Sequence, residues 1–91
     1  MYYTYILYLN NGDLYKGSTS NLKSRLVDHK NGKVLSTKNK QPRLIHYECY
    51  ILQSDAMRRE RFLKTTGGRR LLKQQIRDIL EKLNKPSSFN G

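Results

Sequence analysis

Hydrophobic and aromatic residues occupy both alternating faces of the segment 2–9, apart from Thr4. A strand that is apolar on both faces is typical of the middle of a sheet that is covered on both sides. The dipeptide Asn11-Gly12 separates this segment from residues 13–18, which predicts a β-hairpin. A β-branched and aromatic run over residues 43–52 predicts a third strand.

The length of the hairpin loop decides which tyrosines share a face of the sheet. A two-residue turn would set Tyr8 opposite Tyr15 and put Tyr5 on the other face. A three-residue loop, with Gly12 in the left-handed conformation of a bulge, would set Tyr5 opposite Gly17. We expect the three-residue loop, because only it places Tyr5 and Tyr15 on one face and leaves room beside Tyr5.

Residues 21–31 predict a helix whose inner face is unusual. Asn21 is a good N-cap, and Gly32 supplies a C-terminal stop. Helical periodicity places four residues on one face, namely Leu22, Arg25, Leu26 and His29. A guanidinium on a buried face either finds a carboxylate on the strand side or is kept for a ligand, and the sequence leaves both open.

The next helix places a carboxylate inward. Ser54 is expected to cap this helix, which runs through Lys64 and ends at Gly67-Gly68. Glu60 falls in the middle of an apolar arc that is formed by Ala56, Met57 and Leu63. An i,i+4 pair with Lys64 would explain the spacing. We favour a metal ligand, because hard cations take oxygen donors and the pair alone does not explain why Glu60 faces inward.

The remaining segments complete an α+β domain. Residues 32–42 predict a lysine-rich surface loop, and His46 is expected to be an ordinary strand residue. Residues 69–83 predict a third helix with an apolar stripe of Leu71, Leu72, Ile76, Ile79, Leu80 and Leu83. We therefore expect one domain over residues 1–84 and a polar tail over residues 85–91.

Charge narrows the choice of partner. The 91 residues include 18 lysines and arginines against 7 acidic residues, a net charge of +11, and a polyanion is the simplest partner. A membrane surface is disfavoured, because no basic helix has an aromatic face. The single cysteine, Cys49, excludes an intrachain disulfide and a cysteine-based zinc site. Without a signal peptide or an apolar spanning run, we expect a cytoplasmic protein, with a monomer as its simplest state.

Four groups of residues occur in an order that is more specific than any one of them. They are Tyr3-Thr4-Tyr5, then Tyr15-Lys16-Gly17, then Arg25 and His29, and then Glu60 within Arg-Arg-Glu-Arg-Phe-Leu-Lys. This set resembles the GIY-YIG nuclease family, above all its small stand-alone bacterial members, over roughly residues 2–64. The resemblance implies a three-stranded antiparallel sheet of order 2-1-3 flanked by helices. It also implies a DNA endonuclease that uses one divalent metal ion, Mg²⁺ or Mn²⁺.

The resemblance implies a role for each residue of the catalytic set. Glu60 would hold the metal ion, and Arg25 would contact the scissile phosphate. Tyr15, or alternatively Tyr5, would act as the general base on water. His29 would orient the tyrosine pair or relay protons for it. Many family members carry an asparagine beyond the glutamate, and no residue after Glu60 matches it.

Basic residues of the loop and the helices are candidate phosphate contacts, namely Lys16, Lys33, Lys38, Lys40, Arg58, Arg59 and Lys64. The expected substrate is DNA, including branched or single-stranded forms, with a role in DNA repair. Two alternatives stay open. One is a catalytically inactive nucleic-acid-binding module on the same fold, which would also use Arg69 and Arg70. The other is an interaction protein that docks on a partner through the helix over residues 69–83.

Overall fold

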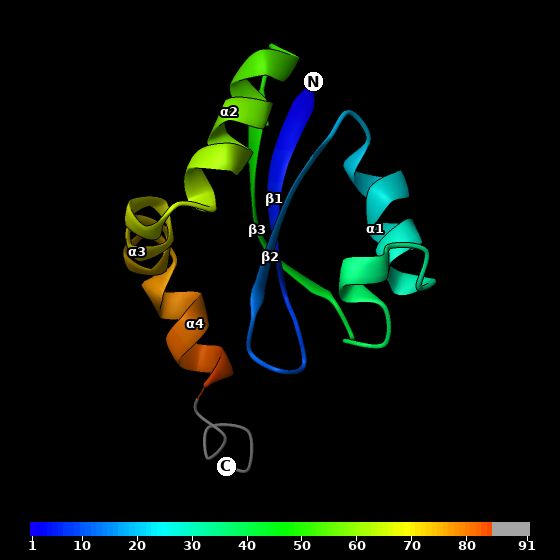
Figure 1. The fold of residues 1–91 in the computed structure, drawn as a ribbon, viewed down its shortest axis with the longest axis vertical. Coiled ribbons are helices and arrows are strands. Elements are labelled where there is room, and N and C mark those ends of the chain that lie inside the picture. The colour runs from blue at the N-terminus through cyan, green and yellow to red at the C-terminus, as the bar shows by residue number, and fades with distance from the viewer. Residues whose placement is uncertain (85–91) are drawn as a thin grey trace.

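The computed structural model describes residues 1–84, in which a three-stranded antiparallel sheet carries helices on both faces (Figure 1). The strands are β1 (Tyr2–Tyr8), β2 (Leu14–Thr19) and β3 (Arg43–Tyr50), in the order β2-β1-β3. The α+β class, the strand order and the central place of the apolar strand are as predicted. The polar tail expected over residues 85–91 lies outside the described residues.

The β1–β2 hairpin has the loop that the placement of Tyr5 required. Gly12 has φ +89°, and its N–H donates to the Leu9 carbonyl at 2.8 Å. The register sets Tyr5 opposite Gly17. A Cβ at Gly17 would lie 2.5 Å from the Tyr5 ring, so only glycine leaves room for the ring to cross β2.

One face of the sheet is covered by α1 (Leu22–Lys30) and by the single 3₁₀ turn η1 (Leu35–Thr37) (Figure 1). Asn21 caps α1 by accepting a hydrogen bond from the Ser24 N–H at 3.0 Å, as predicted. The core on this side consists of Tyr5, Leu7 and Leu9 packed against Tyr15, Leu22, Leu26 and Leu44. The sequence predicts only a loop over residues 32–42, and the structure adds η1 within it.

The opposite face is covered by α2 (Gln53–Leu63), α3 (Thr66–Gln75) and α4 (Arg77–Leu83) (Figure 1). Ile6 points to this side and packs with Leu63, Leu72 and Ile76. Strand β1 therefore gives alternate side chains to two cores, which explains why its sequence is apolar on both faces. None of the helices within residues 1–84 has the length and apolar character that crossing a membrane requires.

The predicted boundaries of the second helix are wrong at both ends. Helix α2 has Leu52 as its N-cap, with no side-chain hydrogen bond there, so Ser54 lies inside the first turn. The helix ends at Leu63, and Gly67-Gly68 belong to the first turn of α3.

Gly68 serves helix packing rather than helix termination. A Cβ at this position would overlap the carbonyl group of Phe62 at the end of α2. Thr65 caps α3 by accepting a hydrogen bond from the Gly68 N–H at 3.0 Å. The glycine therefore lets α3 start directly against the last turn of α2.

The single helix predicted over residues 69–83 is in fact two helices. Ile76 has φ −110° and ψ 30°, which ends α3 and starts α4 in a new direction. Leu72 and Ile76 are buried as the apolar stripe predicts, but Leu71 is 51% exposed. Met57, placed in the apolar arc of α2, is likewise exposed.

Candidate active site

Strands β1 and β2 and helix α1 bring four of the five predicted catalytic residues together. The ring centroids of Tyr5 and Tyr15 lie 6.3 Å apart. The His29 ring lies 5.6 Å from that of Tyr5 and 5.0 Å from that of Tyr15. The hairpin register places the two tyrosines, and the spacing of one helical turn places Arg25 beside His29 on the same face of α1.

His29 is 2% exposed, and both of its ring nitrogens have partners. Nε2 lies 2.8 Å from the Tyr5 hydroxyl, and Nδ1 lies 2.8 Å from Thr37 Oγ1. The Thr37 hydroxyl donates to the Val34 carbonyl at 3.4 Å, so Thr37 accepts from Nδ1–H and Nε2 accepts from Tyr5. Burial, followed by the charge of Arg25, lowers the pKa of His29. The imidazole is therefore neutral at neutral pH.

Tyr5 keeps its proton at neutral pH. Burial raises the pKa of Tyr5 to about 12, although contact with the Arg25 guanidinium acts in the opposite direction. The hydroxyl keeps its proton and donates it in a hydrogen bond to His29, so Tyr5 is poorly suited to accept a proton from water. Of the alternatives that the sequence left open, Tyr15 is the better one on these grounds.

Arg25 is not buried, although its position in the helix suggested that it would be. Its side chain is 38% exposed, and Asp28 of the same helix lies 3.8 Å away. Of the two alternatives that the sequence left open, a carboxylate on the strand side is absent from its described ion pairs. Contact with the Tyr5 hydroxyl, ahead of contact with Tyr15, raises the pKa of Arg25. The guanidinium thus lies against the tyrosine hydroxyls and keeps part of its surface open to a ligand.

Glu60 approaches β2 from the other face of the sheet. The Ser18 hydroxyl donates to its Oε1 at 2.7 Å, and Lys64 Nζ donates to its Oε2 at 2.7 Å, so the predicted i,i+4 pair is present. Burial acts to raise the pKa of Glu60, but the hydrogen bonds from Lys64 and Ser18 lower it overall. The charge of Glu60 also contributes to the raised pKa of Tyr5. The carboxylate therefore lies within electrostatic range of Tyr5, Tyr15, Arg25 and His29, which we call the tyrosine cluster.

The donor set at Glu60 suits a hard divalent cation. Within residues 1–84 no group of three or more His, Cys, Asp or Glu side chains could hold a metal ion together. Mg²⁺ is often held by one carboxylate together with water and substrate phosphate oxygens. Each oxygen of Glu60 accepts one hydrogen bond and has a second acceptor position left. Glu60 therefore fits Mg²⁺ or Mn²⁺ as a single protein ligand.

Comparisons with known proteins identify the family of this chain. The family model of the GIY-YIG catalytic domain matches residues 1–74. The chain belongs to the GIY-YIG nuclease family. No solved structure matches this GIY-YIG chain significantly.

Several proteins named UPF0213 are similar to this GIY-YIG chain. One from Staphylococcus epidermidis is 35% identical over 74 residues, which cover 79% of this chain and 90% of that protein. One from Bacillus licheniformis is 37% identical over 65 residues, covering 69% and 67%. One from Haloquadratum walsbyi is 31% identical over 87 residues, covering 93% and 96%. These names describe no activity.

Two residues that support the GIY-YIG site were missed by reasoning from the sequence. Ser18 could have been found, because alternation along β2 turns it away from Tyr15 and toward α2. Thr37 carries no such signal, since it lies in a connection without periodicity. Only the fold of η1 buries it against His29.

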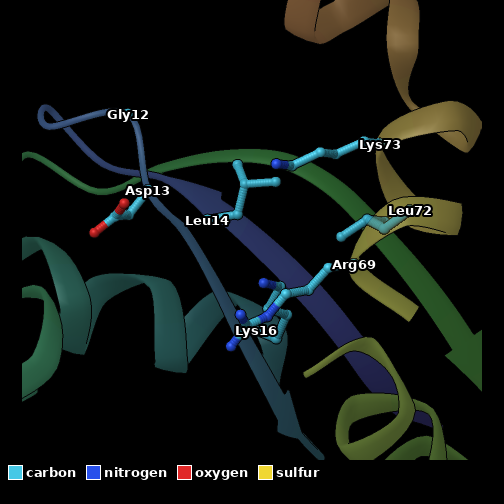
Figure 2. A pocket seen from close by; sticks show the side chains of 7 residues that line it. All are labelled: Gly12, Asp13, Leu14, Lys16, Arg69, Leu72 and Lys73. Atoms are coloured by element: carbon cyan, nitrogen blue, oxygen red, sulfur yellow. The ribbon is translucent and has the colours of Figure 1, made fainter. Parts of the chain in front are cut away.

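The predicted phosphate contacts fall into three environments. The connection between α1 and β3 carries Lys33, Lys38 and Lys40. On α2 and at its C-terminus three candidates already pair with carboxylates, namely Arg58 with Asp55, Arg59 with Glu48, and Lys64 with Glu60. Lys16 lies in a hollow between β2 and α3 (Figure 2). Arg59 in particular is used as a structural partner of Glu48.

Proposed function

We propose that this chain is a metal-dependent endonuclease that hydrolyses DNA phosphodiester bonds, with Mg²⁺ or Mn²⁺ bound at Glu60. One observation carries the proposal: tyrosine, arginine and histidine side chains meet on one face of β2, while Ser18 of the same strand holds a charged carboxylate on the other. Binding to a polyanion does not require such a constellation. Membership of the GIY-YIG family supplies the class of reaction.

Phosphodiester hydrolysis needs an activated water, stabilisation of charge on the phosphoryl oxygens and help for the leaving oxygen. A metal ion bound at Glu60 would supply Lewis-acid stabilisation of the phosphate and of the leaving group. Arg25 would bind non-bridging phosphate oxygens, since its planar fork matches their geometry and part of it is exposed. Tyr15, acting as its phenolate, would accept the proton of the attacking water and become a neutral phenol beside the Arg25 guanidinium.

Tyr5 and His29 act as positioning residues in this proposal. The neutral His29 ring accepts the Tyr5 proton in a hydrogen bond and is itself held by Thr37. This chain of hydrogen bonds keeps the Tyr5 ring across Gly17 and its hydroxyl beside Arg25. Arg25 is thereby directed at the place where the phosphate would lie.

DNA, including branched and single-stranded forms, is the substrate class that we propose, with DNA repair as the setting and a cytoplasmic monomer as the working state. The net charge of +11 supports a polyanionic substrate. Five of the seven carboxylates already pair with basic side chains, so most of the excess positive charge faces solvent rather than balancing acid within the protein.

A cleavage assay on single-stranded, branched and nicked DNA, with and without Mg²⁺, tests the proposal. We expect cleavage that requires Mg²⁺ and that is lost in Glu60→Ala, while the melting temperature and DNA binding remain nearly unchanged. Glu81→Ala is the matched control, because Glu81 is an exposed carboxylate on α4. This control variant should cleave DNA normally.

Three outcomes would contradict the proposal. Mg²⁺-dependent cleavage retained by Glu60→Ala would remove the metal from Glu60. DNA binding without cleavage by the unaltered chain would leave a nucleic-acid-binding module. Unfolding of Glu60→Ala would make the carboxylate a structural partner of Lys64 and Ser18.

A further inference from the structure

A hollow of about 400 Å³ lies between β2 and α3, on the opposite face of β2 from the tyrosine cluster. Three cations surround it, namely Lys16 from β2 and Arg69 and Lys73 from α3. Figure 2 shows the charged ends of Lys16 and Arg69 close to one another and the Lys73 ammonium reaching over Leu14. Leu14 and Leu72 form part of its wall.

The protein around this hollow balances only a small part of its positive charge, through the charge of Asp13. Among the described residues, none of the three cations forms an ion pair. Asp13 is the one carboxylate of the lining, and Figure 2 shows it pointing away from the three cations. Burial, followed by the charges of Arg69 and Lys73, lowers the pKa of Lys16, so these cations repel one another. A bound anion would relieve this repulsion.

The hollow adjoins the proposed active site, because strand β2 contributes residues to both and Lys64 acts on both. Alternation along β2 sends Tyr15 and Gly17 to the tyrosine cluster and Lys16, between them, to the hollow. Lys64 links the two regions, because it pairs with Glu60 at 2.7 Å and its charge also acts on Lys16. Strand β2 is an edge strand, so nothing in the sheet separates one region from the other along that edge.

We propose that the hollow of Lys16, Arg69 and Lys73 binds a backbone phosphate of the same nucleic-acid strand that is cleaved, one or more nucleotides from the scissile phosphate. The identity of the ligand rests on the proposed function. The link through Lys64 favours a polymer over a free phosphate, because a continuous strand can pass around the edge of β2 and occupy both regions. The hollow would hold the strand in register and take no part in bond cleavage.

Binding of a short fluorescently labelled single-stranded oligonucleotide, measured by anisotropy in EDTA at several salt concentrations, tests this site without cleavage. The variant Lys16→Gln/Arg69→Gln/Lys73→Gln, called the hollow variant, removes the three cations. The matched control Lys23→Gln/Lys30→Gln/Lys82→Gln removes the same charge from exposed positions of α1 and α4. We expect the hollow variant to bind at least about tenfold more weakly at low salt, with a salt slope shallower by about 0.7, the contribution of one lost phosphate contact on a single strand. The control should change both much less.

Equal losses in the two triple variants would overturn the proposal, because only net charge would then matter. If the half-buried Lys16 proves necessary for folding, Arg69→Gln/Lys73→Gln against Lys23→Gln/Lys30→Gln gives the same comparison at exposed positions. A different result would contradict the proposed function, namely a lack of Mg²⁺-dependent cleavage by the unaltered chain. That result does not depend on how the two triple variants bind the oligonucleotide. Cleavage by the hollow variant at saturating DNA should persist, with a raised KM.

Discussion

Two neighbouring residues of α2, Arg59 and Glu60, reach opposite edge strands of the sheet and take part in very different ionic contacts. Arg59 reaches Glu48 of β3 through two hydrogen bonds, at 2.9 and 3.2 Å. Glu48 also accepts from Tyr50 at 2.6 Å and lies 3.0 Å from His46, and it is 16% exposed. Glu60 reaches β2 and has only Ser18 and Lys64 as partners.

The difference lies in how many donors each carboxylate has. Glu48 accepts from donors of two elements, β3 and α2, and Arg59 extends the network by donating to Gln75 of α3. Glu60 has one neutral donor and one flexible lysine, and acceptor positions remain. A carboxylate with nearly all of its acceptor positions used stabilises the fold, whereas one with positions left can bind a ligand.

The largest expected effect is on the cleavage rate, which should depend on Glu60 and not on Glu48. Glu60→Gln should lower the cleavage rate by at least about a thousandfold, because the metal ion loses its charged ligand. Glu48→Gln should cleave at close to the normal rate per folded molecule while lowering the melting temperature. Both variants are compared by cleavage kinetics and thermal unfolding. Equal losses of activity in the two variants would remove the contrast.

The second effect is a pH dependence of stability that originates at Glu48. Burial acts to raise the pKa of Glu48, but hydrogen bonds from Tyr50, His46 and Arg59 lower it to about 2, against an ordinary 4.5. A lowered pKa stabilises the folded state above pH 4.5, and this contribution is lost as the pH falls toward 2. Its size is about 3 kcal/mol.

Denaturant unfolding at several pH values measures this contribution. The free energy of unfolding should fall between pH 4.5 and 2 in the unaltered chain and much less in Glu48→Gln. The pKa of Glu60 is also lowered, so Glu60→Gln should reduce the pH dependence of the free energy of unfolding by a smaller amount. An identical acid curve for the unaltered chain and Glu48→Gln would contradict the assignment.

A smaller effect is expected from Gly17→Ala on the tyrosine side of β2. The added methyl group would meet the Tyr5 ring at 2.5 Å and displace it from His29. Overpacking of this kind costs about 1–3 kcal/mol of stability, and the displaced ring should lower cleavage as well. Gly67→Ala is the control, since a Cβ there meets nothing within 4 Å and alanine favours a helix, so the melting temperature should not fall and cleavage should be unchanged.

The smallest effect concerns Lys64, which competes with a cation for Glu60. Removal of the ammonium in Lys64→Met takes away a hydrogen bond that lowers the pKa of Glu60, so this pKa should rise toward its ordinary value. Mg²⁺ binding, measured by isothermal titration calorimetry, should tighten by about twofold to fivefold, as expected for an exposed pair. Lys82→Met on α4 is the control, and equal affinities in the two variants would show that Lys64 does not compete.

Local patterns in the sequence were sufficient to predict much of the fold. Apolar residues on both faces of Tyr2–Tyr8 predicted the central strand, and the requirement that Tyr5 and Tyr15 share a face predicted the register that pairs Tyr5 with Gly17. The N-cap at Asn21 and the helical spacing placed His29 on an inner face. These features depend on residues close together in the chain, so propensity and periodicity can be read directly.

Contacts between elements were decided by the tertiary structure. The sequence suggested that Arg25 is buried and that Gly67-Gly68 end a helix, but packing leaves Arg25 partly exposed and puts both glycines inside α3. The break at Ile76 also lacks a proline or glycine signal, since it depends on how α3 and α4 pack on the sheet.

In the candidate site, too, the sequence predicted some features and only the tertiary structure decided others. The order of Tyr5, Tyr15, Arg25, His29 and Glu60 was visible in the sequence as a family resemblance. The sequence did not show that Thr37 holds His29, that Ser18 holds Glu60, or that Arg59 pairs with Glu48. Each of these contacts joins residues from different elements, and their geometry exists only once both elements pack against the same sheet.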